Sequence, residues 1–269
     1  MKQNTRLQKI LDYLETHNEL SVEHACEMLS ASPATVRRDF VELAQTNKAE
    51  KVWGGIARKD EENSIIKPLF FRQTHHIKEK KAIARRAVEL IKDDDVVLID
   101  GGTTTLEMAA LLIGKRVRII TNSLLIANKI HLQQRGWQAT ELFMTGGLLY
   151  PDSGLLVGPE ACKTISEYHA DWAFISCGGI LESGIYNTNQ LVAETEKEMI
   201  QQSEKSVILA DHSKFGTRSM TKICDFDEVD MIISGEESPP AIAKKMRSMG
   251  TELVAVKNEL DEISNSAHL

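Results

Sequence analysis

The chain has 269 residues and a formal net charge of −7 at pH 7. Its length is enough for about two domains of ordinary size. Its four cysteines show neither a C-x-x-C spacing nor a neighbouring histidine pair, which argues against a zinc module and favours reduced, buried thiols. No apolar run approaches the ~20 residues of a membrane span, and the N-terminus lacks a signal-peptide core. We therefore expect a cytoplasmic protein with no membrane partner, no metal site and no cofactor.

The N-terminal sequence has the helix order of a helix-turn-helix module. Apolar residues between Leu7 and Leu14 recur at helical spacing and predict a first amphipathic helix. Ser21 is the expected N-cap of a second helix, and the short turn 30–31 separates that helix from a third, which Ser32 caps. Helix, helix, tight turn and helix in this order are typical of DNA-binding modules.

The third predicted helix presents two arginines beside its apolar stripe. Val36, Phe40 and Leu43 recur at helical spacing and predict the buried face. Arg37 and Arg38 lie off that stripe near the start of the helix, where guanidinium groups can reach base edges and phosphates. Taken alone, such a segment is more often a surface helix with two solvated arginines, so the interpretation depends on its flanks.

A short β-ribbon is expected after this helix. Residues 49–53 and 56–58 flank Gly54-Gly55, which suits a two-residue hairpin turn and predicts the wing of a winged helix. Residues 1–58 contain eight Lys or Arg and eight Asp or Glu, so DNA binding there must come from the local placement of charge. The residues expected to contact DNA are Ser32, Ala34, Thr35, Arg37, Arg38, Lys48, Lys51 and Arg58.

Residues 5–57 resemble the N-terminal domain of the DeoR family of bacterial transcription regulators. The matching positions are Arg6, Ile10 and Leu14 in the first helix, Thr35, Val36, Arg37, Arg38, Asp39 and Phe40 in the third, and Gly54-Gly55 in the wing. The chain departs from the family at residues 44–47, where the family often has a glutamate and a glycine-bearing turn. The resemblance implies a winged helix-turn-helix domain that binds a double-stranded DNA operator.

The remainder of the chain predicts an α/β domain. Residues 59–75 carry charge, a proline and little periodicity, and we interpret them as an interdomain linker whose Phe70-Phe71 pair docks on one of the two domains. From residue 76 to 257, short apolar strands alternate with helices, which predicts a largely parallel sheet with helices on both faces. Residues 258–269 form a polar tail that we expect to fray.

Four polar loops follow strands of this predicted sheet, and ligands of such sheets bind beyond the carboxyl ends of the strands. A phosphate would be held there by backbone N–H groups that the glycines leave accessible, by threonine hydroxyls and by the positive end of a helix. The residues expected to bind this anionic, hydroxylated effector are Asp100, Gly101, Gly102, Thr103, Thr104, Thr105, Thr121, Asn122, Ser123, Gly146, Gly147, Asp211 and Lys214.

Each loop also has a purely structural interpretation. Thr104 and Ser123 could be helix caps, the glycines could be tight turns, and Lys214 could be a solvated lysine. For any one loop taken alone these structural roles are favoured. The sequence contains neither the dinucleotide G-x-G-x-x-G nor the P-loop motif, so nucleotide binding gains no support.

Residues 76–256 resemble the sensor domain of the DeoR family. The matching residues are Lys80, Ile83-Ala84, Asp100 to Thr105, Thr121 to Ser123, Thr145 to Gly147, Gly158, Ala170-Asp171, Gly179-Ile180, Gly184, Glu194 and Ala210 to Gly216. The family fold is similar to ribose-5-phosphate isomerase and glucosamine-6-phosphate deaminase. The resemblance implies a repressor of a carbohydrate-catabolism operon that a sugar phosphate releases from its operator. Because one module makes few base contacts, we expect a homodimer or homotetramer.

Two alternatives remain at this stage. A sugar-phosphate isomerase or deaminase with an appended DNA-binding domain would need a positioned acid and base, for which Asp100, Asp211, His212 and Lys214 are candidates. The sequence shows no matching catalytic constellation, and we therefore expect no enzyme activity. A plain oligomerisation domain without a ligand would leave the four polar loops unexplained.

Overall fold

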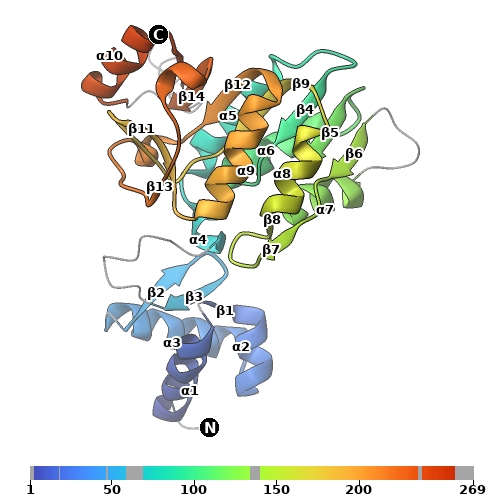
Figure 1. The fold of residues 1–269 in the computed structure, drawn as a ribbon. Coiled ribbons are helices and arrows are strands. Elements are labelled where there is room, and N and C mark those ends of the chain that lie inside the picture. Colours follow the sequence, from blue (N-terminus) through green and yellow to red (C-terminus); the bar gives the residue numbers. More distant parts are fainter. Residues whose placement is uncertain are drawn as a thin grey trace, which may run out of the picture. The chain divides into compact units, whose positions relative to one another are not determined.

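The computed structural model describes residues 3–17, 19–46, 48–58, 69–133, 140–235 and 238–257. The chain divides into two compact units, residues 1–74 and residues 75–269, which we call the N-terminal unit and the C-terminal unit (Figure 1). None of the described helices is long and apolar enough to cross a membrane.

The N-terminal unit is a small helical domain with a three-stranded antiparallel sheet in the order β1-β3-β2. Its elements are α1 (Gln3–Thr16), β1 (Glu19–Ser21), α2 (Val22–Leu29), α3 (Pro33–Gln45), β2 (Ala49–Val52), β3 (Gly55–Arg58) and α4 (Leu69–Thr74). The three predicted helices and the ribbon are confirmed. Strand β1 was not predicted, because only Leu20 of its three residues is buried and a single apolar residue gives no period.

Serine residues cap the N-termini of α2 and α3, which a short turn separates. The Ser21 hydroxyl accepts a hydrogen bond from the His24 backbone N–H, and the Ser32 hydroxyl accepts one from Thr35. Between them, Ser30 adopts the left-handed conformation and its N–H closes the end of α2. The buried faces then meet around Val36 and Phe40, which are among the least exposed residues of this unit.

A buried ion pair joins the first and third helices. Arg6 Nε lies 2.6 Å from Asp39 Oδ2, and a second Arg6 nitrogen donates to Asp39 Oδ1 at 2.9 Å. Asp39 is 1% exposed, so its carboxylate depends on this two-pronged contact for its hydrogen bonds. Asp39 therefore holds the reading helix α3 against α1 and does not face solvent.

The C-terminal unit is built on a parallel sheet. Among the described residues, seven strands form it in the order β15-β14-β12-β9-β4-β5-β6, and every neighbouring pair is parallel. In chain order the elements are α5 (Ile77–Val88), β4 (Val96–Ile99), α6 (Thr103–Leu112), β5 (Arg118–Thr121), α7 (Leu124–Gln133), β6 (Glu141–Met144), β7 (Leu148–Tyr150), β8 (Leu155–Val157), α8 (Pro159–Ser166), β9 (Ala170–Ile175), β10 (Gly179–Leu181), β11 (Gly184–Asn187), α9 (Gln190–Gln201), β12 (Ser203–Leu209), η1 (His212–Lys214), β13 (Thr221–Cys224), η2 (Phe226–Glu228), β14 (Met231–Gly235), α10 (Pro240–Met249) and β15 (Glu252–Val256).

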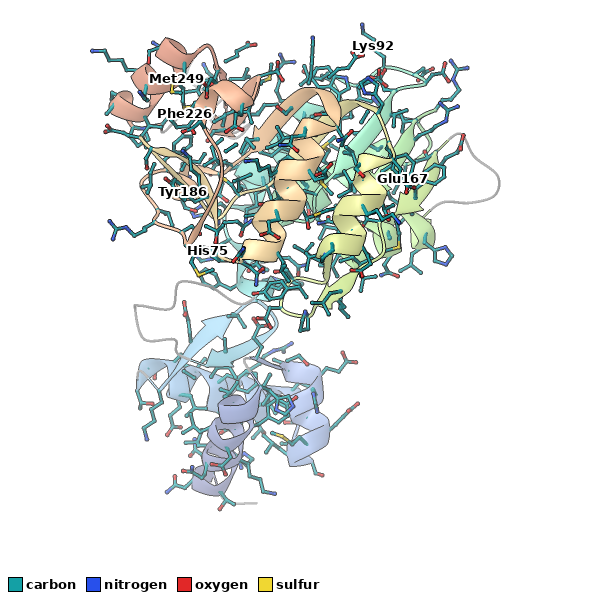
Figure 2. All side chains as sticks on the ribbon, viewed as in Figure 1. His75, Lys92, Glu167, Tyr186, Phe226 and Met249 are labelled. Atoms are coloured by element: carbon teal, nitrogen blue, oxygen red, sulfur yellow. The ribbon has the colours of Figure 1, made fainter. Side chains whose placement is uncertain are left out.

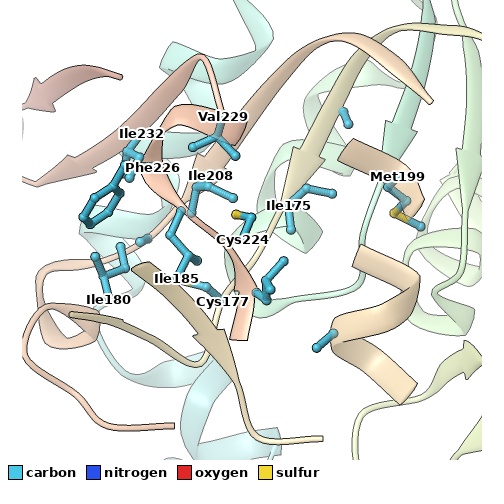
Figure 3. Packing of buried hydrophobic residues seen from close by; sticks show 14 of the residues in the cluster. Ile175, Cys177, Ile180, Ile185, Met199, Ile208, Cys224, Phe226, Val229 and Ile232 are labelled. Atoms are coloured by element: carbon cyan, nitrogen blue, oxygen red, sulfur yellow. The ribbon is translucent and has the colours of Figure 1, made fainter. Parts of the chain in front are cut away.

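Helices cover both faces of this sheet, as predicted. Buried residues of α5, α6 and α7 pack on one face, and buried residues of α8, α9 and α10 pack on the other. On the second face the core continues into a small antiparallel sheet, β10-β11-β13, where Ile180, Ile185 and Cys224 meet Phe226 (Figure 3).

The sequence did not predict the small sheet or the β7-β8 hairpin. Their strands have three or four residues each, which is too short for a two-residue period to become visible. Of the segment interpreted as a linker, residues 59–68 and the Phe70 side chain lie outside the described residues, whereas Leu69–Thr74 form α4. The interpreted polar tail, residues 258–269, also lies outside them.

The Arg6 to Asp39 pair generates a stability prediction. Arg6→Met removes both charged hydrogen bonds from the buried Asp39 carboxylate. It should therefore lower the thermal midpoint of the N-terminal unit, measured in the full chain. Replacing both partners, in Arg6→Met with Asp39→Leu, should recover much of that loss because no buried charge is left. Lys9→Met on the exposed face of α1 is the control for lost charge. Scanning calorimetry checks this, and an unchanged midpoint in Arg6→Met would show that the pair contributes nothing.

Candidate DNA-binding surface and effector site

The residues expected to contact DNA lie mainly on the outward side of α3. Arg37 and Arg38 are exposed, as are Ser32 and Ala34 at the start of the helix. The Thr35 hydroxyl is engaged with the Ser32 hydroxyl at 2.9 Å, so these two side chains also hold the first turn of α3 together.

The wing supplies the remaining expected contacts. Lys48 precedes β2 and Lys51 lies within it, and both side chains are exposed. The Arg58 side chain lies outside the described residues. Trp53, which the sequence interpretation left without a role, is 82% exposed at the turn between β2 and β3. Val52 pairs with Gly55, so the two turn residues are Trp53 and Gly54, and the predicted turn at Gly54-Gly55 is wrong by one residue.

In the C-terminal unit the polar loops lie at the carboxyl ends of the parallel strands. Figure 2 labels His75, just before α5, and Lys92, between α5 and β4, at opposite ends of this unit. Because β4 runs away from Lys92, its carboxyl end lies at the end marked by His75. The predicted effector residues and the start of α5 therefore belong to the same end of the unit.

Asp100 connects three neighbouring strand ends. Its carboxylate accepts hydrogen bonds from the Ser176 hydroxyl at 2.7 Å, from the Ser176 N–H at 3.2 Å and from Asn122 Nδ2 at 3.3 Å. Asn122 in turn accepts the Gly101 N–H at 3.0 Å. Asp100 and Asn122 are both 0% exposed, so they position the loops after β4, β5 and β9.

The glycines after Asp100 are required by close packing. Gly102 has an extended backbone, with φ of −149°, and a Cβ there would lie 2.4 Å from the Cβ of Ser176. At Gly101 a Cβ would lie 2.0 Å from a methyl carbon of Leu155. Both glycines let neighbouring loops approach one another.

Helix α6 begins directly after this loop. Gly102 is its N-cap, and the Thr105 hydroxyl accepts the Gly102 N–H at 2.7 Å and donates to the Gly102 carbonyl at 3.0 Å. Thr104 and Thr105 are buried, whereas Thr103 is partly exposed. The first turn of α6, with the Thr103 side chain, is the part of this loop that can meet an anion.

The other predicted loops are mostly engaged in internal contacts. The Thr121 hydroxyl donates to the Ile99 carbonyl at 2.7 Å, and the Ser123 hydroxyl accepts the Ile126 N–H at 3.3 Å. Gly146 and Gly147 have φ of +68° and +110° and form the exposed turn before β7, a conformation that favours glycine. These residues shape the end of the sheet.

Asp211 is held by Lys80, which was not among the residues expected to bind the effector. The Asp211 carboxylate accepts hydrogen bonds from the Ser213 backbone N–H at 3.1 Å and from the Ser213 hydroxyl, and Lys80 Nζ lies 3.6 Å away. Burial raises the pKa of Asp211, but the Ser213 hydrogen bond and the charges of Lys80, Lys214 and His76 outweigh burial and lower the pKa below its ordinary value. Lys80 is 3% exposed in the apolar stripe of α5, and a lysine in that stripe was the signal for an internal role.

A second carboxyl group, Glu196 of α9, faces Asp100. Asn187 Nδ2 donates to Glu196 Oε1 at 2.5 Å, and Glu196 Oε2 has no donor partner within the described chain. Burial and the negative charge of Asp100 hold the pKa of Glu196 well above its ordinary value, although the Asn187 hydrogen bond opposes them. The raised pKa favours the neutral, protonated form of Glu196.

Several charged groups at this end of the sheet act on the buried thiol of Cys177. Burial raises the pKa of Cys177 to about 12, Lys214 opposes that rise, and Glu196, Asp211 and Asp100 add to it. Lys214 is partly exposed, whereas Lys80 is buried beside Asp211. The structure thus brings together Asp100, Asp211 and Lys214, three of the predicted effector residues.

The loop that carries Lys214 is fastened to the start of α5. His212 donates its backbone N–H to Glu79 Oε1 at 2.7 Å, and His212 Nδ1 lies 2.6 Å from Glu79 Oε2. The His76 ring packs edge-on against His212 with ring centroids 4.4 Å apart. These three side chains could approach a metal ion, but His212 already engages both oxygens of Glu79. The arrangement ties η1 to α5.

Comparisons with known proteins agree with this geometry. Residues 6–62 match the family model of the DeoR-like helix-turn-helix domain, and residues 75–236 match that of the DeoR C terminal sensor domain. The chain belongs to the DeoR family. Within this family the N-terminal unit is the helix-turn-helix domain and the C-terminal unit is the sensor domain, and the chain is a DNA-binding transcription regulator.

Similar regulators align over almost the whole chain. The HTH-type transcriptional repressor GlcR of Bacillus subtilis (strain 168) is 32% identical over 96% of this chain and 98% of its own length. The HTH-type transcriptional regulator UlaR of Shigella flexneri is 30% identical over 95% of this chain and 100% of its own length.

Solved structures show a more distant likeness. Ribose 5-phosphate isomerase A from Methanocaldococcus jannaschii has a TM-score of 0.37 and 19% identity, covering 52% of this chain and 54% of its own. The translation factor subunit eIF2B beta from Chaetomium thermophilum has a TM-score of 0.42 and 13% identity, covering 68% and 55%. Overlap at this level carries no argument about ligand or activity.

The raised pKa of Glu196 predicts a pH-dependent stability. A carboxyl group whose pKa is raised by folding stabilises the folded chain fully below its unfolded pKa, about 4.3. This stabilisation is lost as the pH rises through the folded pKa. Glu196→Gln keeps the shape and an oxygen that can accept from Asn187, but it cannot ionise. Its thermal midpoint minus that of the wild type should therefore increase between acidic and mildly alkaline pH.

Glu194→Gln is the matched control, because it lies on the exposed face of the same helix. Its thermal midpoint should follow that of the wild type at every pH. A Glu196→Gln difference that stays constant from acidic to alkaline pH would contradict the assignment of the proton to Glu196.

Proposed function

We propose that this DeoR-family regulator is a cytoplasmic repressor of a carbohydrate-catabolism operon and that a phosphorylated sugar releases it from its operator. One observation carries the proposal: the strand-end loops combine an accessible helix start at α6 with a partly exposed lysine, Lys214, in a domain joined to a DNA-reading module. The similar regulator GlcR is a repressor, which supports repression over activation.

Operator binding is assigned to α3 and the wing. Arg37 and Arg38 would meet base edges in the major groove, and Lys48 and Lys51 would neutralise phosphates beside it. The N-terminal unit has no excess of positive charge over residues 1–58, so a single module would bind weakly. Two or more copies on repeated half-sites, as a homodimer or homotetramer, would supply the missing affinity.

The effector phosphate is assigned to the first turn of α6. Backbone N–H groups there, together with the Thr103 side chain, lie at the carboxyl ends of the strands. The N–H groups and the positive end of the helix dipole favour an anion. Lys214 would act as a counter-charge from the neighbouring loop. Asp100, Asn122, Thr105 and Asp211 would position these loops, since their side chains are buried and already bonded.

The release signal would travel through η1. A phosphate that draws Lys214 inward moves the loop that His212 fastens to Glu79 of α5. Helix α5 begins at Ile77, three residues after the N-terminal unit ends at Thr74. Ligand and operator would then favour different arrangements of this junction, which is the differential affinity that release requires.

We propose no catalytic role for the sensor domain. The isomerase alternative requires free acids and bases. Asp100 and Asp211 are engaged in buried hydrogen bonds and His212 is engaged by Glu79, which leaves Lys214 as the remaining candidate among the four groups. Incubation with ribose 5-phosphate or glucosamine 6-phosphate tests this directly. Product formation by the purified chain would restore the enzyme alternative.

The reading helix generates a binding prediction. Arg38→Ala should weaken binding to an operator fragment, selected by the wild-type protein from random DNA, by about tenfold or more, because a bidentate base contact is worth about 1–3 kcal/mol. Anisotropy titration at fixed salt measures this. Lys9→Ala, an exposed charge change on α1, should leave affinity unchanged. Equal affinity of Arg38→Ala and wild type would remove this side chain from the interface.

Lys214 provides the test of the effector site. In a thermal-shift titration against a panel of sugar phosphates, a ligand of the native state should raise the wild-type midpoint by mass action. Lys214→Met should weaken the bound compound by about tenfold, because it deletes a charged hydrogen bond and keeps much of the apolar stem.

Lys244→Met on the exposed side of α10 controls for lost charge and should bind the compound as the wild type does. Equal affinities of Lys214→Met and wild type would remove Lys214 from the site. If no sugar phosphate shifts the wild-type midpoint, the proposed effector class fails.

A further inference from the structure

Most of the large apolar side chains that are exposed on the C-terminal unit come from one segment of the chain. Nine large apolar residues of the described chain are exposed, and only Trp53 and Met220 fall outside the segment 111–149. The other seven form what we call the apolar flank: Leu111, Leu124, Leu132, Phe143, Met144, Leu148 and Leu149. A concentration of this kind on a water-exposed surface is typical of an interaction site.

The elements that carry the flank are neighbours in the fold. Helices α6 and α7 pack together, and β6 is the terminal strand in the sheet order, beside β5. The Leu124 N–H at the start of α7 donates to the Gly154 carbonyl in the β7-β8 hairpin, which joins that helix to the hairpin. In Figure 1, β6 and α7 lie at the right of the unit, and β7 lies at its lower edge.

Helix α7 turns an uncharged face to solvent. Its exposed positions are Leu124, Asn128, His131, Leu132 and Gln133. By contrast, the exposed positions of α5 on the same face of the sheet are Lys78, Lys81 and Arg85. A solvent-facing helix of a monomer normally resembles α5, so the α7 face is suited to burial against another surface.

Strand β6 presents an edge with little charge. Glu141, Phe143 and Met144 are exposed, and among the described residues β6 pairs on one side only, with β5. Edge strands of monomers are usually protected by lysine, proline or a bulge. The single charged residue of β6, Glu141, lies 3.5 Å from Arg118 of β5.

Two ion pairs border the flank, and Asp152 in the turn between β7 and β8 is a further exposed charge. Lys129 of α7 lies 3.6 Å from Glu107 of α6, and Arg118 pairs with Glu141. Two copies of this chain can therefore bring the same surface together with little repulsion, although the chain carries a net charge of −7. A surface whose charges are mostly paired within one protomer fits a second copy about a twofold axis better than a partner of strong opposite charge.

We propose that the apolar flank of α7, β6 and β7 is the surface through which two copies of this chain form a dimer. This inference rests on the proposed function in one respect, namely that reading two half-sites requires two copies. The twofold axis passes beside β6, so that α7 and the β7 turn of one protomer cover the same elements of its partner.

The experiment compares three arginine substitutions at similarly exposed positions. Leu132→Arg and Leu148→Arg place a charge in the flank, where the native side chains are 71% and 60% exposed. Met220→Arg is the matched control outside the flank, at 68% exposure. Because all three side chains face solvent in the protomer, each variant should keep the wild-type far-ultraviolet circular dichroism spectrum. Met220→Arg should also keep the wild-type thermal midpoint, whereas loss of the dimer should lower the midpoint of the flank variants.

Sedimentation equilibrium of the full chain supplies the deciding measurement. The wild type and Met220→Arg should have the mass of a dimer or a higher even oligomer, and both flank variants should have half that mass or less at the same concentration. The flank variants should also lose affinity for a DNA fragment with two half-sites while keeping the wild-type affinity for one half-site.

Other outcomes separate the two proposals. A monomeric wild type, flank variants with wild-type mass, or dissociation of Met220→Arg as well would each overturn the flank as the dimer surface. Failure of the wild type to select any DNA would contradict the proposed function, and it would leave the masses of the flank variants to decide the interface independently.

Discussion

The carboxylate of Asp100 is the group on which the C-terminal unit depends at its functional end. It has no exposed surface, and burial raises the pKa of Asp100, although hydrogen bonds from Ser176 and Asn122 oppose that rise. One buried carboxyl group thereby joins the ends of β4, β5 and β9. Without that carboxyl group, three loops would lose a common hydrogen-bond acceptor and the start of α6 would lose its fixed position.

A layer of buried polar groups therefore lies beneath the surface at which we propose that the effector binds. Lys80 holds Asp211, and Glu79 holds His212, so the loop that carries Lys214 is attached to α5 at two points. With these polar groups fixed, the first turn of α6 and the partly exposed Lys214 side chain are the groups that we propose meet the ligand. The same contacts join the proposed site to α5, the helix that opens the C-terminal unit.

Periodicity and capping residues were enough to predict the framework of the chain. Helices α2 and α3, with their serine caps, and strands β4, β6 and β15 were predictable because their apolar spacing and flanking residues agree. The candidate site was harder to predict from the sequence. Asp100 and Asp211 were correctly placed at strand ends, but their partners Ser176, Lys80 and Glu196 come from distant segments, and Glu196 lies in a charged stretch that resembles a solvated face. Only tertiary packing shows that these side chains are buried.

The central claim is that a sugar phosphate bound at the strand ends lowers operator affinity. Its most direct measurement is the operator dissociation constant of the wild-type chain at fixed salt, determined with and without a saturating sugar phosphate and with the same sugar lacking its phosphate. The account predicts a rise of about tenfold or more with the phosphorylated compound, a coupling of 1–3 kcal/mol as is typical of allosteric proteins, and no change with the unphosphorylated sugar. An operator affinity that stays constant across all sugar phosphates, or that responds equally to the free sugar, would contradict it.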